Sequence, residues 1–204
     1  MTSFYFGRQK MTPTLNNFKD SCMTQIPKNI LLVSGAGQNV GKTSLIRRII
    51  ARNVAQKIAA IKITPHFHEP TSGLVPLVIT DNYRIFQETA SSSGKDSSLF
   101  LQAGAERVFY IQTTDEYLQE SFNQVSEKLD PEQAVIIESA ALRKILKPSV
   151  FLFLQNKFED IKPSALPMQK LADTIVYSDS GQFSIDPVSI TFDQIWKIKV
   201  DDFS

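Results

Sequence analysis

The residues with the clearest chemical potential in this chain lie in a short glycine-rich segment. Gly37 and Gly41 belong to it, and Lys42, Thr43 and Ser44 follow directly. Glycine allows main-chain N–H groups to approach a polyphosphate closely, because no side chain stands in the way. Lys42 can reach the terminal phosphates as a compact cation, and the Thr43 hydroxyl can act as an oxygen ligand of Mg²⁺. The segment predicts a phosphate-binding loop (P-loop) formed by Gly37, Gln38, Asn39, Val40, Gly41, Lys42, Thr43 and Ser44.

Such a loop must connect a strand to a helix, and the flanking sequence has both patterns. Residues 29–34 form an apolar run typical of a buried strand. Residues 43–53 place their apolar side chains on one stripe of a helix. The unpaired N–H groups and the positive end of that helix would face the phosphates. One departure is that Ala36 stands where the motif usually begins with glycine.

Two carboxylates are candidates for the catalytic machinery. Glu138 ends an apolar strand predicted at 134–139, where nucleotide-hydrolysing enzymes often carry an acid that organises Mg²⁺ or the attacking water. Asp96 begins a helix predicted at 96–105, where it either caps the helix or binds the metal. We predict Lys42, Glu138 and Asp96 as catalytic residues, and Thr43, Glu138 and Asp96 as the Mg²⁺ ligands.

A cationic side chain and two imidazoles follow the second predicted strand. Lys62 lies near the end of that strand, predicted at 57–64, and His66 and His68 come next. They form a candidate substrate loop for an anionic ligand, or they are solvated loop residues. Two histidines without a third ligand at typical spacing are weak evidence for zinc.

A possible base-recognition motif follows the strand predicted at 150–154. Asn156, Lys157 and Glu159 match the Asn-Lys-x-Asp guanine motif of GTPases, with glutamate in place of aspartate. A carboxylate at that position accepts hydrogen bonds from guanine donors that adenine lacks. The alternative is an ordinary polar transition from strand to loop, so the sequence leaves GTP and ATP both open.

The wider pattern alternates strands with helices. Further strands are predicted at 107–112 and 174–177, and further helices at 115–129, 141–146 and 168–172. Near-continuous apolar strands indicate a mostly parallel sheet covered on both faces. We therefore expect an α/β protein, a three-layer sandwich with the P-loop NTPase fold. Such sheets bind ligands at the carboxyl ends of their strands.

Two segments depart from this alternation. Residues 65–95 are rich in proline, glycine and serine and predict a long, functional or mobile loop insertion, with a short strand at 83–88. Residues 183–204 predict an additional strand and a helix around 192–197. Residues 1–27 are polar and unpatterned, and we expect a leader, ordered or disordered, outside a single domain formed by 28–204.

Composition narrows the class of protein. The chain has 204 residues and a net charge of +1, so no large basic footprint for nucleic acid is visible. A single cysteine, Cys22, excludes an internal disulfide and suits the cytoplasm. No apolar stretch reaches the ~18 residues of a membrane span, and the start of the chain lacks the apolar core of a secretory signal.

These motifs, taken in order over residues 29–140, resemble the accessory GTPase of molybdopterin-guanine dinucleotide biosynthesis. The resemblance rests on the P-loop, Lys62 with nearby histidines, Asp96-Ser97 before Ala103-Gly104-Ala105, and Glu138. Ser139 replaces the glycine usual in that family, and Phe100 replaces a common histidine. The resemblance implies a Mg²⁺-dependent GTPase that assists a cofactor-biosynthesis enzyme, and a homodimer.

Three functions are consistent with these residues. The first is a slow GTPase in molybdenum-cofactor or metal-centre assembly. The second is an ATP-dependent small-molecule ligase or kinase similar to dethiobiotin synthetase, with segment 65–95 forming an acceptor pocket. The third is a nucleotide-binding switch without useful turnover.

Overall fold

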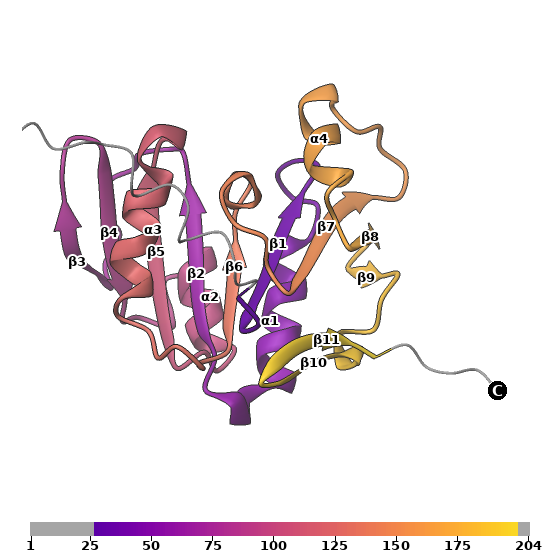
Figure 1. Ribbon diagram of the computed structural model, residues 1–204, viewed down its shortest axis with the longest axis horizontal. Helices are drawn as coiled ribbons and strands as arrows, with labels where there is room; N and C mark the ends of the chain where they lie inside the picture. The colour runs from indigo at the N-terminus through magenta and orange to yellow at the C-terminus, as the bar shows by residue number, and fades with distance from the viewer. Residues whose placement is uncertain (1–26, 200–204) are drawn as a thin grey trace, which may run out of the picture.

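The computed structural model describes residues 27–199, and the predicted leader therefore lies, except for Pro27, outside the described residues. The elements follow one another along the chain as shown in Figure 1. In order they are β1 (Ile30–Gly35), α1 (Lys42–Arg52), η1 (Val54–Gln56), β2 (Ala59–Thr64), β3 (Leu74–Ile79), β4 (Tyr83–Glu88), α2 (Asp96–Gln102), β5 (Arg107–Thr113), η2 (Asp115–Tyr117), α3 (Leu118–Ser126), β6 (Val135–Glu138), η3 (Leu142–Lys144), β7 (Val150–Asn156), η4 (Pro163–Ala165), α4 (Leu166–Gln169), β8 (Thr174–Asp179), β9 (Gln182–Phe183), η5 (Pro187–Ser189), β10 (Ile190–Asp193) and β11 (Ile195–Ile198).

A nine-stranded sheet forms the centre of the molecule, in the order β3-β4-β5-β2-β6-β1-β7-β8-β9. The strands from β5 to β8 in this order pair in parallel. The antiparallel pairings, β3–β4, β4–β5 and β8–β9, lie at the two edges. The predicted α/β class with a large, mostly parallel sheet is confirmed.

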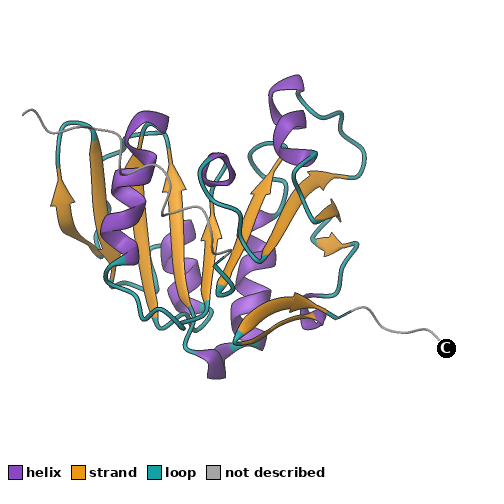
Figure 2. Cartoon of the chain, in the orientation of Figure 1, coloured by secondary structure: helices purple, strands orange, loops and turns teal. Residues whose placement is uncertain are grey.

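Strand β1 explains why the sheet is covered on both faces. Its side chains alternate between two hydrophobic clusters, because successive residues of a strand point to opposite faces. Leu31 and Val33 belong to one cluster, with the apolar side chains of α1, α2 and the β10–β11 hairpin. Ile30 and Leu32 belong to the other cluster, with α3 and η3. Figure 2 shows helices on both sides of the sheet, an arrangement compatible with three layers.

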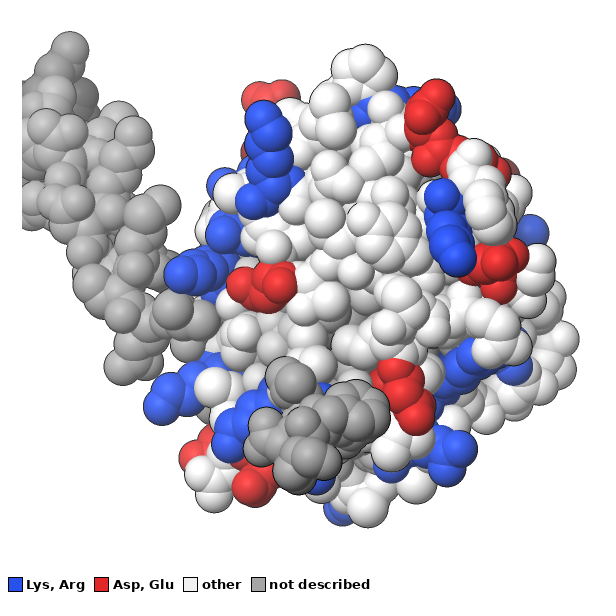
Figure 3. All heavy atoms as spheres, turned by 90° about the vertical axis from the view of Figure 1, so that its right-hand side faces the viewer, with Lys and Arg blue, Asp and Glu red and all other residues white. Residues whose placement is uncertain are grey.

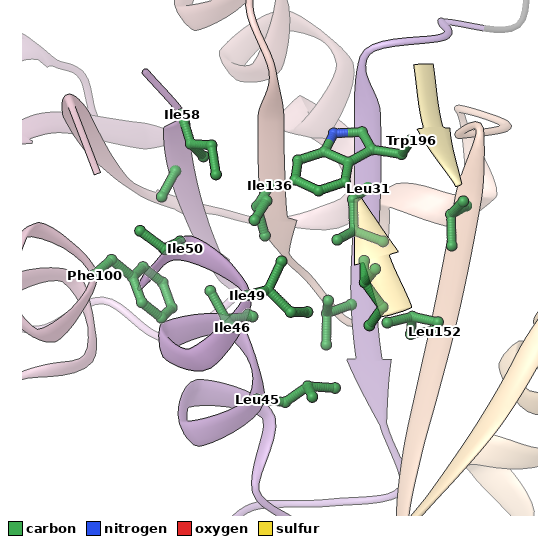
Figure 4. Close-up of a cluster of buried hydrophobic side chains, with 14 of the residues drawn as sticks. Leu31, Leu45, Ile46, Ile49, Ile50, Ile58, Phe100, Ile136, Leu152 and Trp196 are labelled. Atoms are coloured by element: carbon green, nitrogen blue, oxygen red, sulfur yellow. The ribbon is translucent and has the colours of Figure 1, made fainter. Parts of the chain in front are cut away.

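The side of the core that supports α1 is built from tightly packed aliphatic and aromatic side chains. Leu45, Ile46, Ile49 and Ile50 of α1 are fully buried against the sheet. Trp196 of β11 lies over the sheet beside Leu31 and Ile136 in Figure 4, and only 1% of it is exposed. The apolar stripe predicted for residues 43–53 therefore packs α1 against the sheet, and this packing fixes the position of the first turn of the helix.

The segment predicted as a long loop at 65–95 contains one strand that was not expected, β3 at Leu74–Ile79. Residues 74–88 form the β3–β4 hairpin, which extends the sheet antiparallel to β5. Pro76 lacks an N–H donor and is tolerated because β3 is an edge strand, and the pairing shifts register just after it. The strand predicted at 83–88 is confirmed as β4, and loop structure is confined to 65–73 and 89–95.

The prediction of a helix around 192–197 was also wrong. The segment is an antiparallel hairpin, β10–β11, in which Phe192 pairs with Trp196 and their ring centroids lie 5.3 Å apart. Apolar and polar residues alternate in Ile190-Thr191-Phe192 and in Trp196-Lys197-Ile198, a period-2 pattern that favours strands. Residues 200–204 of the predicted tail lie outside the described residues.

The face at the β8–β9 end of the sheet is shown in Figure 3. Lysine and arginine side chains there are interspersed with acidic ones around a central area without charged residues. The exposed apolar side chains of β8 at this end are Ile175 and Tyr177. Among residues 27–199, no helix has the length and apolarity that crossing a bilayer requires.

Candidate functional site

The glycine-rich segment forms a loop, residues 36–41, between the carboxyl end of β1 and the start of α1 (Figure 1). The amide of Ala36 donates to the carbonyl of Leu154 on β7 at 2.8 Å, which fixes the start of the loop. The hydroxyl of Ser178 on β8 donates to the carbonyl of Val40 at 2.9 Å, which fixes its end. The loop is therefore held by two neighbouring strands of the same sheet.

The amides of this loop are available to a ligand. Between the described residues, no hydrogen bond is donated by the main-chain N–H groups of residues 37–44. Gly41 precedes α1 with φ of 90°, a left-handed conformation that glycine adopts without steric cost. The ammonium group of Lys42 donates to the carbonyl oxygen of Gly37 across the loop at 2.6 Å. The loop and the first turn of α1 thus combine unpaired donors with one cation, as an anion-binding site requires.

Four further side chains form an acid–base cluster next to the loop, which we define as Thr43, Lys62, Asp96 and Glu138. Lys62 forms ion pairs with Asp96 and, at 3.2 Å, with Glu138. The Thr43 hydroxyl donates to Glu138 Oε2 over 3.4 Å. Lys62 and Glu138 are brought together by the parallel register of β2 and β6, in which they are direct neighbours. Lys62 and Glu138, predicted near the ends of two strands, therefore lie side by side at one edge of the sheet, next to Thr43 of α1 and Asp96 of α2.

Burial and mutual charge shift the pKa values of Lys42, Lys62 and Asp96. Burial lowers the pKa of Lys42, and the positive charge of Lys62 adds to the effect, against partial compensation by Glu138 and Asp96. Burial also acts to lower the pKa of Lys62, but Glu138 and Asp96 outweigh it and the pKa is raised. For Asp96 burial acts to raise the pKa, but Lys62 outweighs it and the pKa is lowered. Shifted lysine and carboxyl groups gathered at one site are typical of functional sites.

The oxygen donors present fit Mg²⁺. Thr43 Oγ1 and Glu138 Oε2 lie 3.4 Å apart, close to the roughly 3 Å that separates adjacent ligands of an octahedral ion with bonds of about 2.1 Å. The Asp96 carboxylate belongs to the same cluster, because it forms an ion pair with Lys62. The described residues contain no group of three or more histidine, cysteine or acidic side chains suited to a metal ion. Phosphate oxygens and water would therefore have to complete the coordination, which is the usual mode for Mg²⁺.

The two histidines of the predicted substrate loop do not join the acid–base cluster. His66 and His68 are both exposed, and their ring centroids are 6.1 Å apart. His68, but not His66, lines a pocket of about 300 Å³ that also includes Lys62 and Asp96. The predicted substrate loop therefore contributes Lys62 and His68 to one concave surface.

The residues proposed to recognise a base lie in one exposed turn at the end of β7. The side-chain amide of Asn156 donates to Glu159 Oε1 at 2.8 Å, and the amide N–H of Phe158 donates to Asn156 Oδ1 at 3.0 Å. The ammonium of Lys157 lies over the Phe158 ring, 5.6 Å from its centroid. A guanine bound here would have to replace the Asn156 amide as the partner of Glu159.

Several residues that shape the site are not evident in the sequence. Ser178 and Phe183 contact the glycine-rich loop from β8 and β9, where nothing in the local pattern points to the loop. Tyr110 lines the pocket because β5 pairs with β2 in the register Lys62–Tyr110. A long-range strand register of this kind cannot be read from sequence spacing.

No protein-family model, curated protein or solved structure matches this chain significantly.

Proposed function

We propose that this protein is a P-loop NTPase that binds the triphosphate of a nucleotide, together with Mg²⁺, at the loop formed by residues 36–41 and the first turn of α1. The observation that carries the proposal is the geometry of the loop. The amides of the loop and of that first turn, from residue 37 to residue 44, have no acceptor among the described residues, and the Lys42 ammonium points across them to Gly37. The loop lies at the carboxyl ends of parallel strands, where α/β sheets bind ligands.

Each group of the site has a chemical role in that proposal. The loop amides and Lys42 neutralise and orient the phosphate chain, which accounts for most of the catalysis in phosphoryl transfer. Thr43, Glu138 and Asp96 would hold Mg²⁺, which would neutralise part of the negative charge of the phosphate chain. No arginine finger was identified in the sequence, so intrinsic hydrolysis is slow, as in the accessory GTPase that the chain resembles.

The physiological role that follows from the resemblance is assistance in molybdenum-cofactor or metal-centre assembly with GTP. Guanine as the base rests on the sequence Asn156-Lys157-Phe158-Glu159, whose Glu159 carboxylate would exchange the Asn156 amide for the guanine donors. The pocket beside Lys62 and Asp96 favours the second candidate, an ATP-dependent ligase or kinase acting on a small molecule.

Substitution of Lys42 tests the proposal. We expect Lys42→Ala to lose at least about tenfold in affinity for Mg²⁺·GTP and Mg²⁺·ATP, because a charged contact to phosphate contributes roughly 1.5–3 kcal/mol. Isothermal titration calorimetry of both nucleotides gives the affinities and assigns the base.

The matched control is Lys128→Ala, which removes the same charge from an exposed position just after α3. Its nucleotide affinity should equal that of the wild type. Equal affinities of wild type and Lys42→Ala, with both proteins folded by circular dichroism, would contradict the proposed site.

A further inference from the structure

The pocket beside the acid–base cluster is distinct from the glycine-rich loop. It has a volume of about 300 Å³ and lies between the loop at 65–73 and the start of α2, over the carboxyl-terminal half of β2 and β5. That volume is at the lower end of the range for small-molecule sites, about 300–1,000 Å³. Its inner wall contains Lys62 and Asp96, so it is continuous with the proposed nucleotide site.

The polar groups that line this pocket include donors without a partner. The Thr71 hydroxyl is buried and has no hydrogen-bond partner among the described residues. Lys95 forms none of the ion pairs found within residues 27–199. Tyr110 and His68 add further polar groups, whereas the acid Asp96 is already paired with Lys62 and the other acid, Glu69, is exposed. Lys95 is a cation and the Thr71 and Tyr110 hydroxyls can donate, so the acceptor oxygens of a ligand would satisfy these groups.

The other wall of the pocket is apolar. Leu74 and the Tyr110 ring line it, and the Tyr110 ring packs against Phe86 with ring centroids 6.3 Å apart. A small organic skeleton can cover this wall while its charged group faces Lys95 and Thr71. The pocket therefore has the two parts of a metabolite site, an apolar surface and a few convergent donors.

We propose that this pocket binds a second small molecule that carries an oxyanion, either a carboxylate or a phosphate ester, next to the triphosphate tail. The inference rests on the proposed function for the identity of its neighbour, because Lys62 and Asp96 belong to both sites. Lys62 then contacts the bound molecule on one side and Glu138 of the nucleotide site on the other.

Titration of the protein with two simple probes tests the inference. Succinate represents carboxylates and glycerol 3-phosphate represents phosphate esters, each added by calorimetry with a non-hydrolysable triphosphate analogue and Mg²⁺ present. We expect one of the two probes to bind with a dissociation constant of roughly 1 mM or lower. Thr71→Val and Tyr110→Phe should each weaken that binding roughly tenfold, as the loss of a hydrogen bond to a charged group predicts.

The control variant is Tyr177→Phe, which removes the same hydroxyl from an exposed position on β8. It should bind the probe as the wild type does. The inference is wrong if neither probe binds, or if Thr71→Val and Tyr110→Phe bind the probe as tightly as the wild type. The probe that binds distinguishes the carboxylate from the phosphate ester.

The same titrations keep this inference separate from the proposed function. Nucleotide binding by wild type, Thr71→Val and Tyr110→Phe is measured first, without a probe. Nucleotide binding that is normal in all three proteins, with no probe binding, rejects the pocket alone. Probe binding that depends on Tyr110, in a wild-type protein that binds no nucleotide, rejects the P-loop proposal and leaves the pocket standing.

Discussion

The two lysines of the site carry the same charge but have different partners. Lys62 contacts two carboxylates, Asp96 and Glu138, and its side chain is 18% exposed. Among residues 27–199, the ammonium of Lys42 donates a hydrogen bond to the carbonyl oxygen of Gly37 and forms no ion pair, and burial lowers its pKa. Lys62 is thus a counter-ion that stabilises the protein as it stands, whereas Lys42 is a largely buried charge that, in the proposed function, would gain a strong partner from a triphosphate.

The same substitution at the two lysines should therefore change stability differently. At pH 7 we expect Lys62→Met to lower the free energy of unfolding by about 1–3 kcal/mol, because two acids lose their counter-ion. The value lies below that for a fully buried pair because the Asp96 side chain is 41% exposed. Lys42→Met should change stability by less than about 0.5 kcal/mol or increase it, because it removes a desolvated charge. Urea denaturation of both variants measures the difference.

The pH dependence of the Lys62 effect has a definite sign. The pKa of Asp96 is lowered from 3.8, so its stabilisation is present above that value and is lost as pH falls through the lowered pKa. The pKa of Lys62 is raised from 10.5, so its stabilisation is present below that value and is lost as pH rises through the raised pKa. The decrease in the free energy of unfolding caused by Lys62→Met should thus be constant from about pH 5 to pH 9 and become smaller below pH 3. An equal cost at pH 2 and pH 7 would rule out the ion pair as its cause.

At the scale of elements, the glycine-rich loop depends on a hairpin that is remote in sequence. A Cβ atom added at Gly41 would lie 3.0 Å from the Phe183 ring of β9, and Ser178 of β8 binds the Val40 carbonyl. Phe183 is itself fixed by Arg48 of α1, whose guanidinium carbon is 5.1 Å from the ring centroid. The β8–β9 hairpin and α1 therefore hold the end of the loop at Val40 and Gly41, whereas β7 holds its start.

Alanine at two glycines separates this packing from backbone strain. Gly41 and Gly181 have φ of 90° and 82°, so each alanine should cost about 1–2 kcal/mol of stability. Only Gly41→Ala meets a neighbour, because nothing lies within 4 Å of a Cβ at Gly181. We expect Gly41→Ala to cost more in chemical denaturation and also to weaken nucleotide binding. Gly181→Ala should bind nucleotide normally, and identical behaviour of the two variants would contradict the role of the Phe183 contact.

The predictability of these elements from sequence follows the range of the interactions that form them. The strand at 29–34, the loop and α1 were predicted closely, because apolar runs and glycine positions are local signals. β3 was missed since Pro76 argues against a strand, and only its place at the sheet edge makes the proline acceptable. The helix predicted around 192–197 was wrong although the period-2 pattern at 190–192 and 196–198 favours strands; pairing of Phe192 with Trp196 and burial of Trp196 on the sheet stabilise the hairpin.

In the candidate site, too, residues with a local sequence signal were predictable and residues placed by long-range pairing were not. Lys42, Thr43, Lys62, Asp96 and Glu138 were chosen one by one at strand ends and helix starts, and parallel pairing brings them together. Thr71 and Tyr110 carry no local signal, because their place in the pocket depends on the register of β5 with β2 and on the path of the loop at 65–73.

At the scale of the whole molecule, the site joins parts of the chain that are far apart in sequence. The acid–base cluster consists of Thr43 of α1, Lys62 of β2, Asp96 of α2 and Glu138 of β6. The glycine-rich loop adds contacts to β7 and β8. A ligand that bridges the loop and the cluster would therefore stabilise both halves of the sheet together, rather than one loop alone.

Thermal unfolding measures that coupling. A ligand at about 100 times its dissociation constant stabilises the folded state by about 2.7 kcal/mol. For a protein of this size, with about 2–4 °C per kcal/mol, Mg²⁺·GTP or Mg²⁺·ATP should raise Tm by roughly 5–10 °C. The shift should be full in Lys128→Ala. In Lys42→Ala it should fall to about half or less at the same nucleotide concentration, because a tenfold loss of affinity leaves about 1.4 kcal/mol of stabilisation. A full shift in Lys42→Ala would show that the nucleotide binds away from the loop.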